Sequence, residues 1–475
     1  MYSPRSDLQS LCSMPHFLEK LLTSVDDDLG SESYIDPIGT LIIWSAFGRE
    51  IFNSRINSVS NDIRNYTVNL LHHFVVRKLV GDDRVKLSGS LQRHYKNKDS
   101  LNFKQACLIF LENVFVFSMI QQQEKDGVET AGILGIGKAR RLWFAEDHDP
   151  PLIFTHENDG QILVRQLSLG VSGRYKTPLM GIGFFDANYQ YHRPDSQPHW
   201  TEAERLIEGT RGSPLGKLAQ LAYEQLVDQV SRQNYKAKPL FSGIDDGLKK
   251  AYVRAFSSPS TVGIYAREFW LRKTGLADGA AGALLTVIED TEIDGDASPR
   301  EMLELAGLSQ MEAPERAKLA RISELEPFLS DCALLFTLMA GDRTHSISAV
   351  AKQWRAFGRY EERLPMLARD VETHGGEAAM RKSPEAARRL RHLQKVANAG
   401  EFNDQVRAMA AYHGSVMQSR GQTSWLSIED DGAIKVQART LARPDIEDRR
   451  PGEWYNGYYL PQFRSFVTGL KETAT

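Results

Sequence analysis

The chain of 475 residues carries 58 basic and 61 acidic residues, and its formal net charge of -3 excludes a histone-like or strongly polyanionic protein. With 41% hydrophobic and 25% charged residues, it has the composition of a globular protein and not of a disordered one. Its length suggests about three domains or two large ones, and the charge balance still allows a local nucleic-acid-binding surface.

The three cysteines, Cys12, Cys107 and Cys332, are odd in number and far apart in the sequence. A disulfide framework and a cysteine-based zinc site are therefore not expected, and a reducing cytoplasm fits this pattern. Residues 1–22 include Asp7 and Pro15 and lack the apolar region of a signal peptide, so no signal peptide is predicted.

Apolar residues at helical spacing predict helices at residues 38–52, 58–80 and 102–120. The longest apolar stretch, 106–120, is interrupted by Glu112 and Asn113 and is shorter than the roughly 20 residues that span a membrane. It is therefore predicted to be a buried helix of a soluble protein, with no membrane partner.

Further helices are predicted in the middle of the chain. Thr201 and Glu204 have capping-box spacing, Pro259 is placed to open a helix that ends near Gly275, and residues 327–340 are apolar enough for a central core helix. Apolar residues also recur on one helical face at Leu218, Ala222, Leu226 and Val230.

Two β-hairpins are predicted where an Asp-Gly turn separates residues that favour strands. The first occupies residues 151–170 with its turn at 158–160, and the second occupies residues 424–438 with its turn at 430–432. Glycine accepts the positive φ that such turns require. No βαβ alternation is present, which argues against a doubly wound nucleotide-binding fold.

The predicted fold is mainly α with small antiparallel β-hairpin elements, in a multi-lobed α-helical (α+β) protein. We expect a helical N-terminal lobe at 1–200, which holds the first hairpin and a long loop at 172–200. A helical lobe at 201–375 follows, acidic in its C-terminal half because residues 281–375 hold 10 basic and 17 acidic side chains. Residues 376–475 are expected to hold a basic helix, the second hairpin and an aromatic tail.

The sequence of residues 132–139 nearly matches the motif of a phosphate-binding loop, but Ala139 occupies the position where Ser or Thr would hold magnesium. The preceding segment is polar and does not resemble a strand. A glycine-rich connector into a basic helix explains the same residues, and no cofactor is expected.

An acidic segment resembles part of a calcium-binding loop. Its oxygen ligands would be Asp290, Glu292, Asp294 and Glu301. The alternative is a helix start, in which Ser298 is the N-cap and Glu301 completes a capping box. No metal site is therefore predicted, and these four residues are the candidates if one exists.

Arg369 and His374 have the spacing of an Arg-His pair in HEPN-type ribonucleases, where histidine acts as acid or base and arginine stabilises phosphate charge. Several such spacings arise by chance in this chain, and a helix C-terminus also favours both side chains. No catalytic residue is therefore assigned beyond this candidate pair.

Residues 381–395 form a basic segment, in which Ser383 and Pro384 are placed to start a helix. The candidate phosphate-binding residues on this helix are Arg388, Arg389, Arg391 and Lys395. The alternatives are a solvated amphipathic helix and one that docks on the acidic residues 281–375.

The loop at 172–200 interleaves cationic and aromatic side chains, as surfaces that stack on single-stranded nucleic acid do. Its candidate binding residues are Arg174, Tyr175, Lys176 and Tyr189. The alternative is an insertion whose aromatic side chains pack on the helical body.

From these patterns we expect a non-enzymatic, nucleic-acid-contacting subunit of a cytoplasmic bacterial multiprotein complex. An antiviral-defence complex or a nucleic-acid-processing complex would be a concrete example. Its partners would be DNA or RNA and other protein subunits. The alternatives are a phosphodiesterase-type nuclease with an unrecognised site and a pure protein-binding scaffold.

Overall fold

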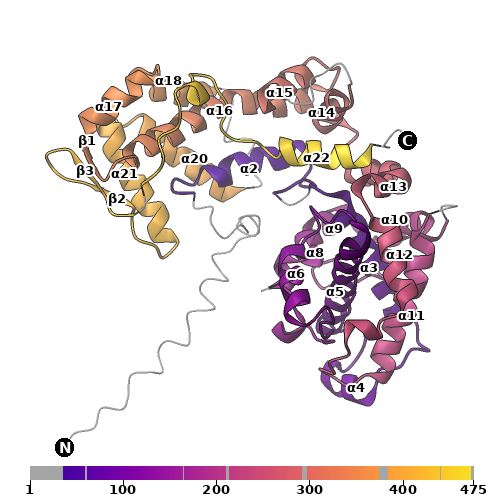
Figure 1. Ribbon diagram of the computed structural model, residues 1–475. Helices are drawn as coiled ribbons and strands as arrows, with labels where there is room; N and C mark the ends of the chain where they lie inside the picture. The colour runs from indigo at the N-terminus through magenta and orange to yellow at the C-terminus, as the bar shows by residue number, and fades with distance from the viewer. Residues whose placement is uncertain are drawn as a thin grey trace, which may run out of the picture. The chain divides into compact units, whose positions relative to one another are not determined.

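The computed structural model describes residues 36–58, 61–163, 165–209, 213–290, 297–373, 383–438 and 440–471. These residues are mainly helical with one small antiparallel sheet, as predicted (Figure 1). The chain divides into two compact units, and each is built from two separate stretches of sequence. Unit 1 comprises Met1–Asn57 and Ala277–Pro461, and unit 2 comprises Ser58–Leu276 and Gln462–Thr475. Neither unit coincides with the lobes expected at 1–200, 201–375 and 376–475, because residues distant in the sequence pack together.

Unit 2 is helical. Its elements are α3 (Ile63–Gly81), α4 (Gly89–Tyr95), α5 (Leu101–Asp126), α6 (Ile136–Ala145), η2 (Asn158–Gly160), α7 (Gln166–Leu169), α8 (Val171–Arg174), α9 (Lys176–Ile182), α10 (Gln197–Glu204), η3 (Arg205–Gly209), α11 (Leu215–Arg232), η4 (Phe241–Gly243), α12 (Asp246–Phe256), α13 (Pro259–Thr274) and α22 (Leu460–Leu470).

The central helix of unit 2 is α5, which contacts α3, α6, α8 and α12 (Figure 1). By length and composition it is the one helix in the described part of the chain that could cross a membrane, but 94% of its apolar window is buried inside the protein. This agrees with its prediction as a core helix. Phe110, Phe115 and Phe117 on α5 are each at most 1% exposed and supply much of the apolar contact.

In unit 2, the bounds predicted from local sequence are correct for α13 but not for α10. Ser258 caps α13 by accepting the Thr261 N–H, and Gly275 ends that helix with φ 67°, as predicted. Thr201 does not cap a helix. It lies inside α10, which begins at Gln197, and its hydroxyl donates to the Gln197 carbonyl. Pro198 near the start of α10 accounts for the earlier beginning.

The first predicted hairpin is absent from the described residues of 151–170. Residues 158–160 form the short helix η2, and the buried Gly160 carbonyl accepts a hydrogen bond of 2.8 Å from Asn113 Nδ2 on α5. Gln166 opens α7 and donates from Nε2 to Asn113 Oδ1 at 2.9 Å. Tertiary hydrogen bonds to a core helix thus replace the expected strand ladder.

The adjacent carboxyl of Glu112 also anchors this segment. Glu112 is 2% exposed and accepts the Val171 N–H at 3.0 Å, at the start of α8. Burial raises its pKa to about 7, against an ordinary value of 4.5, while the hydrogen bonds from Val171 and Ser172 oppose the rise.

This pKa predicts a loss of stability as the pH rises from 4.5 to about 7. The folded protein holds the Glu112 proton over this range and the unfolded chain releases it, which corresponds to about 3 kcal/mol in the free energy of unfolding. Glu112→Gln keeps an acceptor for Val171 but has no proton to lose. Denaturant unfolding of both proteins near pH 4.5 and above pH 7 should show the loss in the wild type alone, and an equal loss in both would contradict it.

Unit 1 holds the rest of the described helices and the sheet. Its elements are α2 (Thr40–Ile51), α14 (Gly279–Glu289), α15 (Pro299–Gly307), α16 (Ala313–Met339), β1 (Thr344–Ser346), α17 (Ile347–Ala356), α18 (Arg363–Thr373), α20 (Pro384–Ala397), α21 (Phe402–Ser419), β2 (Leu426–Ile428), β3 (Ala433–Val436) and η5 (Glu447–Arg449).

The core helix of unit 1 is α16, which contacts α2, α14, α15, α17, α18 and α21. The apolar stretch at 327–340 forms its second half, as predicted, but the helix begins earlier and includes Pro327. The aromatic tail packs on the same unit, where Tyr458 and Tyr459 are at most 2% exposed and contact the Trp44 ring of α2.

The second predicted hairpin is confirmed. β2 and β3 pair antiparallel, with Ile428 opposite Ile434, and β1 pairs with the other edge of β3 to give the order β1-β3-β2. The Gly432 φ of 85° is the left-handed conformation that a glycine adopts without strain in such a turn. The expected hairpin is therefore part of a three-stranded sheet whose third strand lies far away in the sequence.

Candidate functional site

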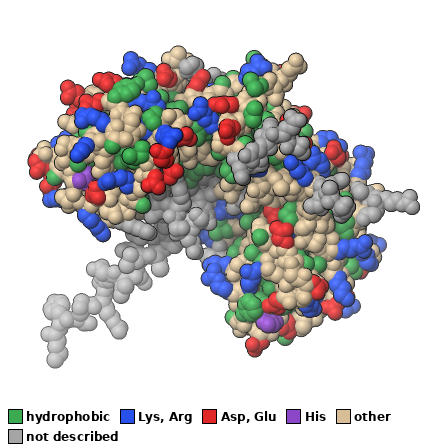
Figure 2. All heavy atoms as spheres, turned by 45° about the horizontal axis from the view of Figure 1, so that its top comes forward, with side chains coloured by type: hydrophobic (Ala, Val, Ile, Leu, Met, Phe, Trp, Pro, Cys, Tyr) green, Lys and Arg blue, Asp and Glu red, His purple; other side chains and the backbone are tan. Residues whose placement is uncertain are grey.

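The basic helix predicted from Ser383 and Pro384 is α20. Its apolar face is buried, with Leu390 and Leu393 each 0% exposed, while Arg388, Arg391 and Lys395 are exposed. The three cations follow one another at i, i+3 and i+7 and therefore lie along one side of the helix. Figure 2 shows Lys and Arg side chains intermixed with Asp and Glu over the face in view.

Arg388 on this face has a partner within its own helix. Its Nε and Nη2 donate to the two carboxylate oxygens of Glu385 at 2.9 and 2.8 Å. Near the exposed cations lies the half-buried His392, whose pKa is lowered by burial and further by Arg388, Lys395 and Arg391. The positive charges of these three residues thus all act on the His392 side chain.

Arg389 was also predicted to bind nucleic acid, but it is only 7% exposed. Its Nε donates to Glu385 at 2.7 Å, and its guanidinium packs over Gly39 at the start of α2. It also lowers the pKa of the buried Asp36 carboxyl, although burial is the larger effect and raises that pKa. Arg389 therefore belongs to the interior of unit 1, and α20 presents a narrower cationic face than predicted.

The aromatic segment at 172–200 is not a loop without secondary structure, because it contains most of α8, α9 and the start of α10. Tyr175 is 0% exposed and packs edge-on against Tyr66, and Tyr189 is 2% exposed and contacts the His73 ring. Their ring faces are covered by side chains of unit 2. This agrees with the alternative of an insertion that packs on the body, and the two tyrosines offer no surface for stacking on bases.

The two predicted binding cations of that segment, Arg174 and Lys176, are also buried or half-buried in unit 2. Arg174 is 7% exposed, and the half-buried Lys176 donates to the Ala187 carbonyl at 2.8 Å while lying over the Tyr189 ring. Burial lowers the pKa of Lys176. Three of the four predicted binding residues are thus buried, and the fourth is held by Ala187 and Tyr189.

Of the candidate calcium ligands, Glu292 and Asp294 lie outside the described residues. Glu301 completes a capping box with Ser298. Its carboxylate accepts the Ser298 N–H at 2.7 Å, and the Ser298 hydroxyl accepts the Glu301 N–H. The helix-start alternative is thus borne out for Glu301. Asp290 follows the last residue of α14.

His374 of the candidate ribonuclease pair also lies outside the described residues. Arg369 is exposed on α18 and donates from Nε to the Pro365 carbonyl at 3.2 Å.

The glycine-rich segment lines an open groove of 420 Å³ together with Asn61 and Arg141. It leads into α6, whose N-cap Gly135 has φ 83°. However, the N–H groups of Lys138 and Ala139 already donate to the Gly135 carbonyl at 3.1 and 3.0 Å. These two groups are therefore not directed at a phosphate as in a nucleotide-binding loop.

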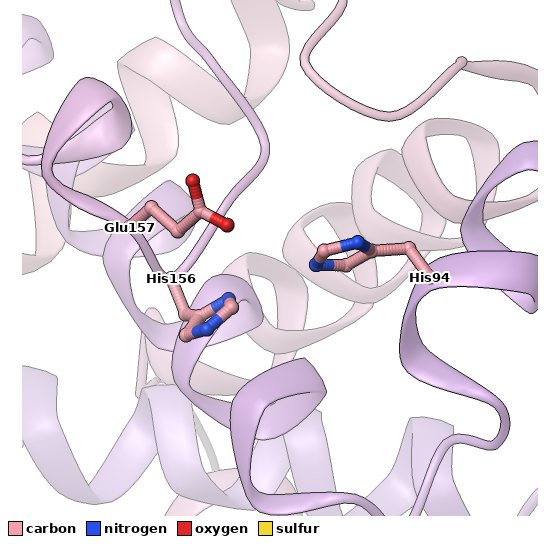
Figure 3. Close-up of side chains that lie close together, drawn as sticks. All are labelled: His94, His156 and Glu157. Carbon is pink, nitrogen blue, oxygen red and sulfur yellow. The ribbon is translucent and has the colours of Figure 1, made fainter.

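A cluster that the sequence did not predict lies elsewhere in unit 2. His94 near the end of α4 and the consecutive residues His156 and Glu157 before η2 turn toward one another (Figure 3). Each offers one nitrogen or carboxylate oxygen, and these atoms lie within 4.8 Å of one another. His94 and Glu157 are exposed and His156 is half-buried, so solvent reaches the cluster.

Neighbouring side chains contact His94 and Glu157 in this cluster. The His94 ring stacks on Tyr235 with centroids 3.6 Å apart, and the Tyr235 hydroxyl donates to Glu157 Oε1 at 2.8 Å. Lys236 bridges Glu157 and Asp159 at 2.8 and 2.7 Å, and hydrogen bonds from Lys236 and Tyr235 lower the pKa of Glu157. Burial lowers the pKa of His156, which favours its uncharged form.

Comparison of the chain with models of protein families, with curated proteins and with solved structures finds no match. The two features of the described residues that bear on function are the cationic face of α20 and the His94 cluster.

Proposed function

We propose that the protein contacts nucleic acid through the exposed face of α20, where Arg388, Arg391 and Lys395 would bind backbone phosphates. The observation that carries the proposal is the separation of faces on this helix. Its apolar residues are buried, and its three cations are exposed along one side. Such an arrangement can release counterions from a polyanion without any change to the packing of unit 1.

The competing explanation is that the basic helix docks on the acidic residues 281–375. α20 does pack on α18, which belongs to that segment, and also on α2 and α21. Yet Arg388 and Arg389 pair with Glu385 of their own helix, and Arg388, Arg391 and Lys395 remain exposed. These facts favour an external partner for the cationic face.

The proposal predicts that Arg391→Glu with Lys395→Glu weakens nucleic-acid binding by at least about tenfold for all base sequences alike. Arg388 is left unchanged because Glu385 holds it and a new carboxylate there would repel Glu385. Fluorescence anisotropy with labelled DNA and RNA, as duplexes and single strands, measures the affinities.

The matched control is Lys217→Glu with Lys250→Glu, two exposed lysines of α11 and α12. It changes the net charge by the same amount but leaves α20 intact, and its affinity should stay close to that of the wild type. If the two double variants bind equally well, net charge and not the α20 face governs binding, and the proposal fails.

Binding to phosphates carries no base preference by itself. Because Tyr175 and Tyr189 are buried, we expect no preference for single strands from base stacking on these two rings. The bacterial multiprotein complex and the role in antiviral defence remain predictions from the sequence.

A further inference from the structure

We propose that His94, His156 and Glu157 bind one divalent transition-metal ion of the zinc type. Two imidazoles with one carboxylate are a donor set that suits zinc and its first-row neighbours, whereas calcium and magnesium prefer oxygen ligands alone. This site lies in unit 2 and is independent of the proposed function of α20, which belongs to unit 1.

The distances between the three donor atoms are not much longer than those in a site with zinc bound. Tetrahedral ligands 2.0–2.1 Å from zinc lie about 3.3 Å apart, and the three donor atoms already lie within 4.8 Å of one another. The remaining approach is small for His94 and Glu157, because both side chains are exposed and can adjust. Three protein ligands would leave the fourth position to water, which is the arrangement of catalytic zinc sites rather than of closed structural ones.

The surroundings supply what a metal site needs beyond its ligands. Tyr235 both stacks on His94 and donates to Glu157, so it orients two of the three ligands. Each carboxylate oxygen of Glu157 accepts one hydrogen bond from Tyr235 or Lys236 and keeps a further lone pair. Lys236 also pairs with Asp159, so its charge stays compensated if the metal draws Glu157 away.

One further observation points to a missing partner. Nδ1 of His156 is buried and has no hydrogen-bond partner among the described residues. A buried polar atom without a partner is costly, and a bond from this nitrogen to a metal ion would give it one.

The test is titration of the full chain with Zn²⁺ by calorimetry and with Co²⁺ by visible absorption, whose d–d bands report the coordination number and geometry of the bound ion. We expect one ion per chain. His94→Phe keeps a ring stacked on Tyr235 but removes the donor atom, and Glu157→Gln keeps the shape but removes the charge. Each should weaken binding by more than about 100-fold, and Tyr235→Phe by about 10–100-fold as the loss of an orienting partner.

The control is His392→Ala, which removes a half-buried histidine of α20 and should leave the affinity unchanged. Circular dichroism establishes that each variant is folded. The proposal is overturned if the folded wild type binds no Zn²⁺, if Ca²⁺ or Mg²⁺ binds equally well, or if His94→Phe and Glu157→Gln both bind like the wild type. Nucleic-acid binding by the His94→Phe variant should be unaltered, so failure here does not touch the proposal for α20.

Discussion

Replacement of Asp331 by alanine should lower the free energy of unfolding by about 3–5 kcal/mol, because it leaves buried positive charge without its counterion. Asp331 on α16 is 1% exposed, and Arg359 is 3% exposed. Arg359 Nη2 contacts Asp331 Oδ1 at 2.8 Å, and Arg363 Nε contacts Oδ2 at 3.0 Å. The carboxylate therefore joins the core helix to the turn before α18 and to α18 itself.

The structure offers a matched control in the same unit. Asp342 and Arg443 form an ion pair of 3.0 Å whose side chains are 50% and 47% exposed. Because such exposed pairs contribute only about 0–1 kcal/mol, Asp342→Ala should change stability little. Denaturant unfolding of both variants measures the difference. Equal losses would mean that burial of the Asp331 cluster has no energetic consequence.

Replacement of Glu326 by alanine is the second change expected to have a large effect. The Glu326 carboxyl on α16 is 0% exposed and accepts hydrogen bonds from the Tyr455 and Asn456 N–H groups, Asn456 Nδ2 and the Tyr458 hydroxyl, at 2.6–2.9 Å. Each buried donor left without an acceptor costs about 1–3 kcal/mol. We expect a total loss of about 4 kcal/mol or more, measured by unfolding in denaturant.

Glu326→Gln separates hydrogen bonding from loss of volume. It keeps the side-chain shape and one carbonyl acceptor, so it should cost less than the alanine variant. Because Glu326 holds the tail that packs on Trp44, limited proteolysis should also cut residues 453–459 faster in the alanine variant. Unchanged proteolysis and stability in Glu326→Ala would show that this carboxyl does not fix the tail.

Elements governed by neighbouring residues were predictable. Ser298, Pro299 and Glu301 form the capping box in the structure, and Gly432 forms the turn of the second hairpin, because both depend on hydrogen bonds and φ values within a few residues. The separation of buried leucines from exposed cations on α20 also follows from helical periodicity alone.

Elements that depend on distant partners were not predictable. Glu112 and Asn113 looked like interruptions of an apolar helix, but they accept and donate the hydrogen bonds that replace the first hairpin. Tyr175 and Tyr189 looked like a binding surface, but other aromatic side chains cover them. Local composition does not reveal which polar or aromatic residue has a partner in the core.

The His94 cluster shows the same difficulty for the site. His156 and Glu157 are adjacent, but His94 and Tyr235 come from distant segments, so no spacing rule unites them. The one signal in the sequence is the pairing of His156 with Glu157, which alone is too common to indicate a metal site. The fold supplies the third ligand and the residues that orient it.

Contact between the exposed α20 face and phosphate should be visible in the salt dependence of nucleic-acid binding. The logarithm of the binding constant should fall linearly with the logarithm of the salt concentration, by about 0.9 for each phosphate contact on duplex DNA. For Arg391→Glu with Lys395→Glu, we expect a slope shallower by about 2 and an unchanged melting temperature. The same slope as in the wild type, together with a lower melting temperature, would contradict it and assign α20 to the internal packing of unit 1.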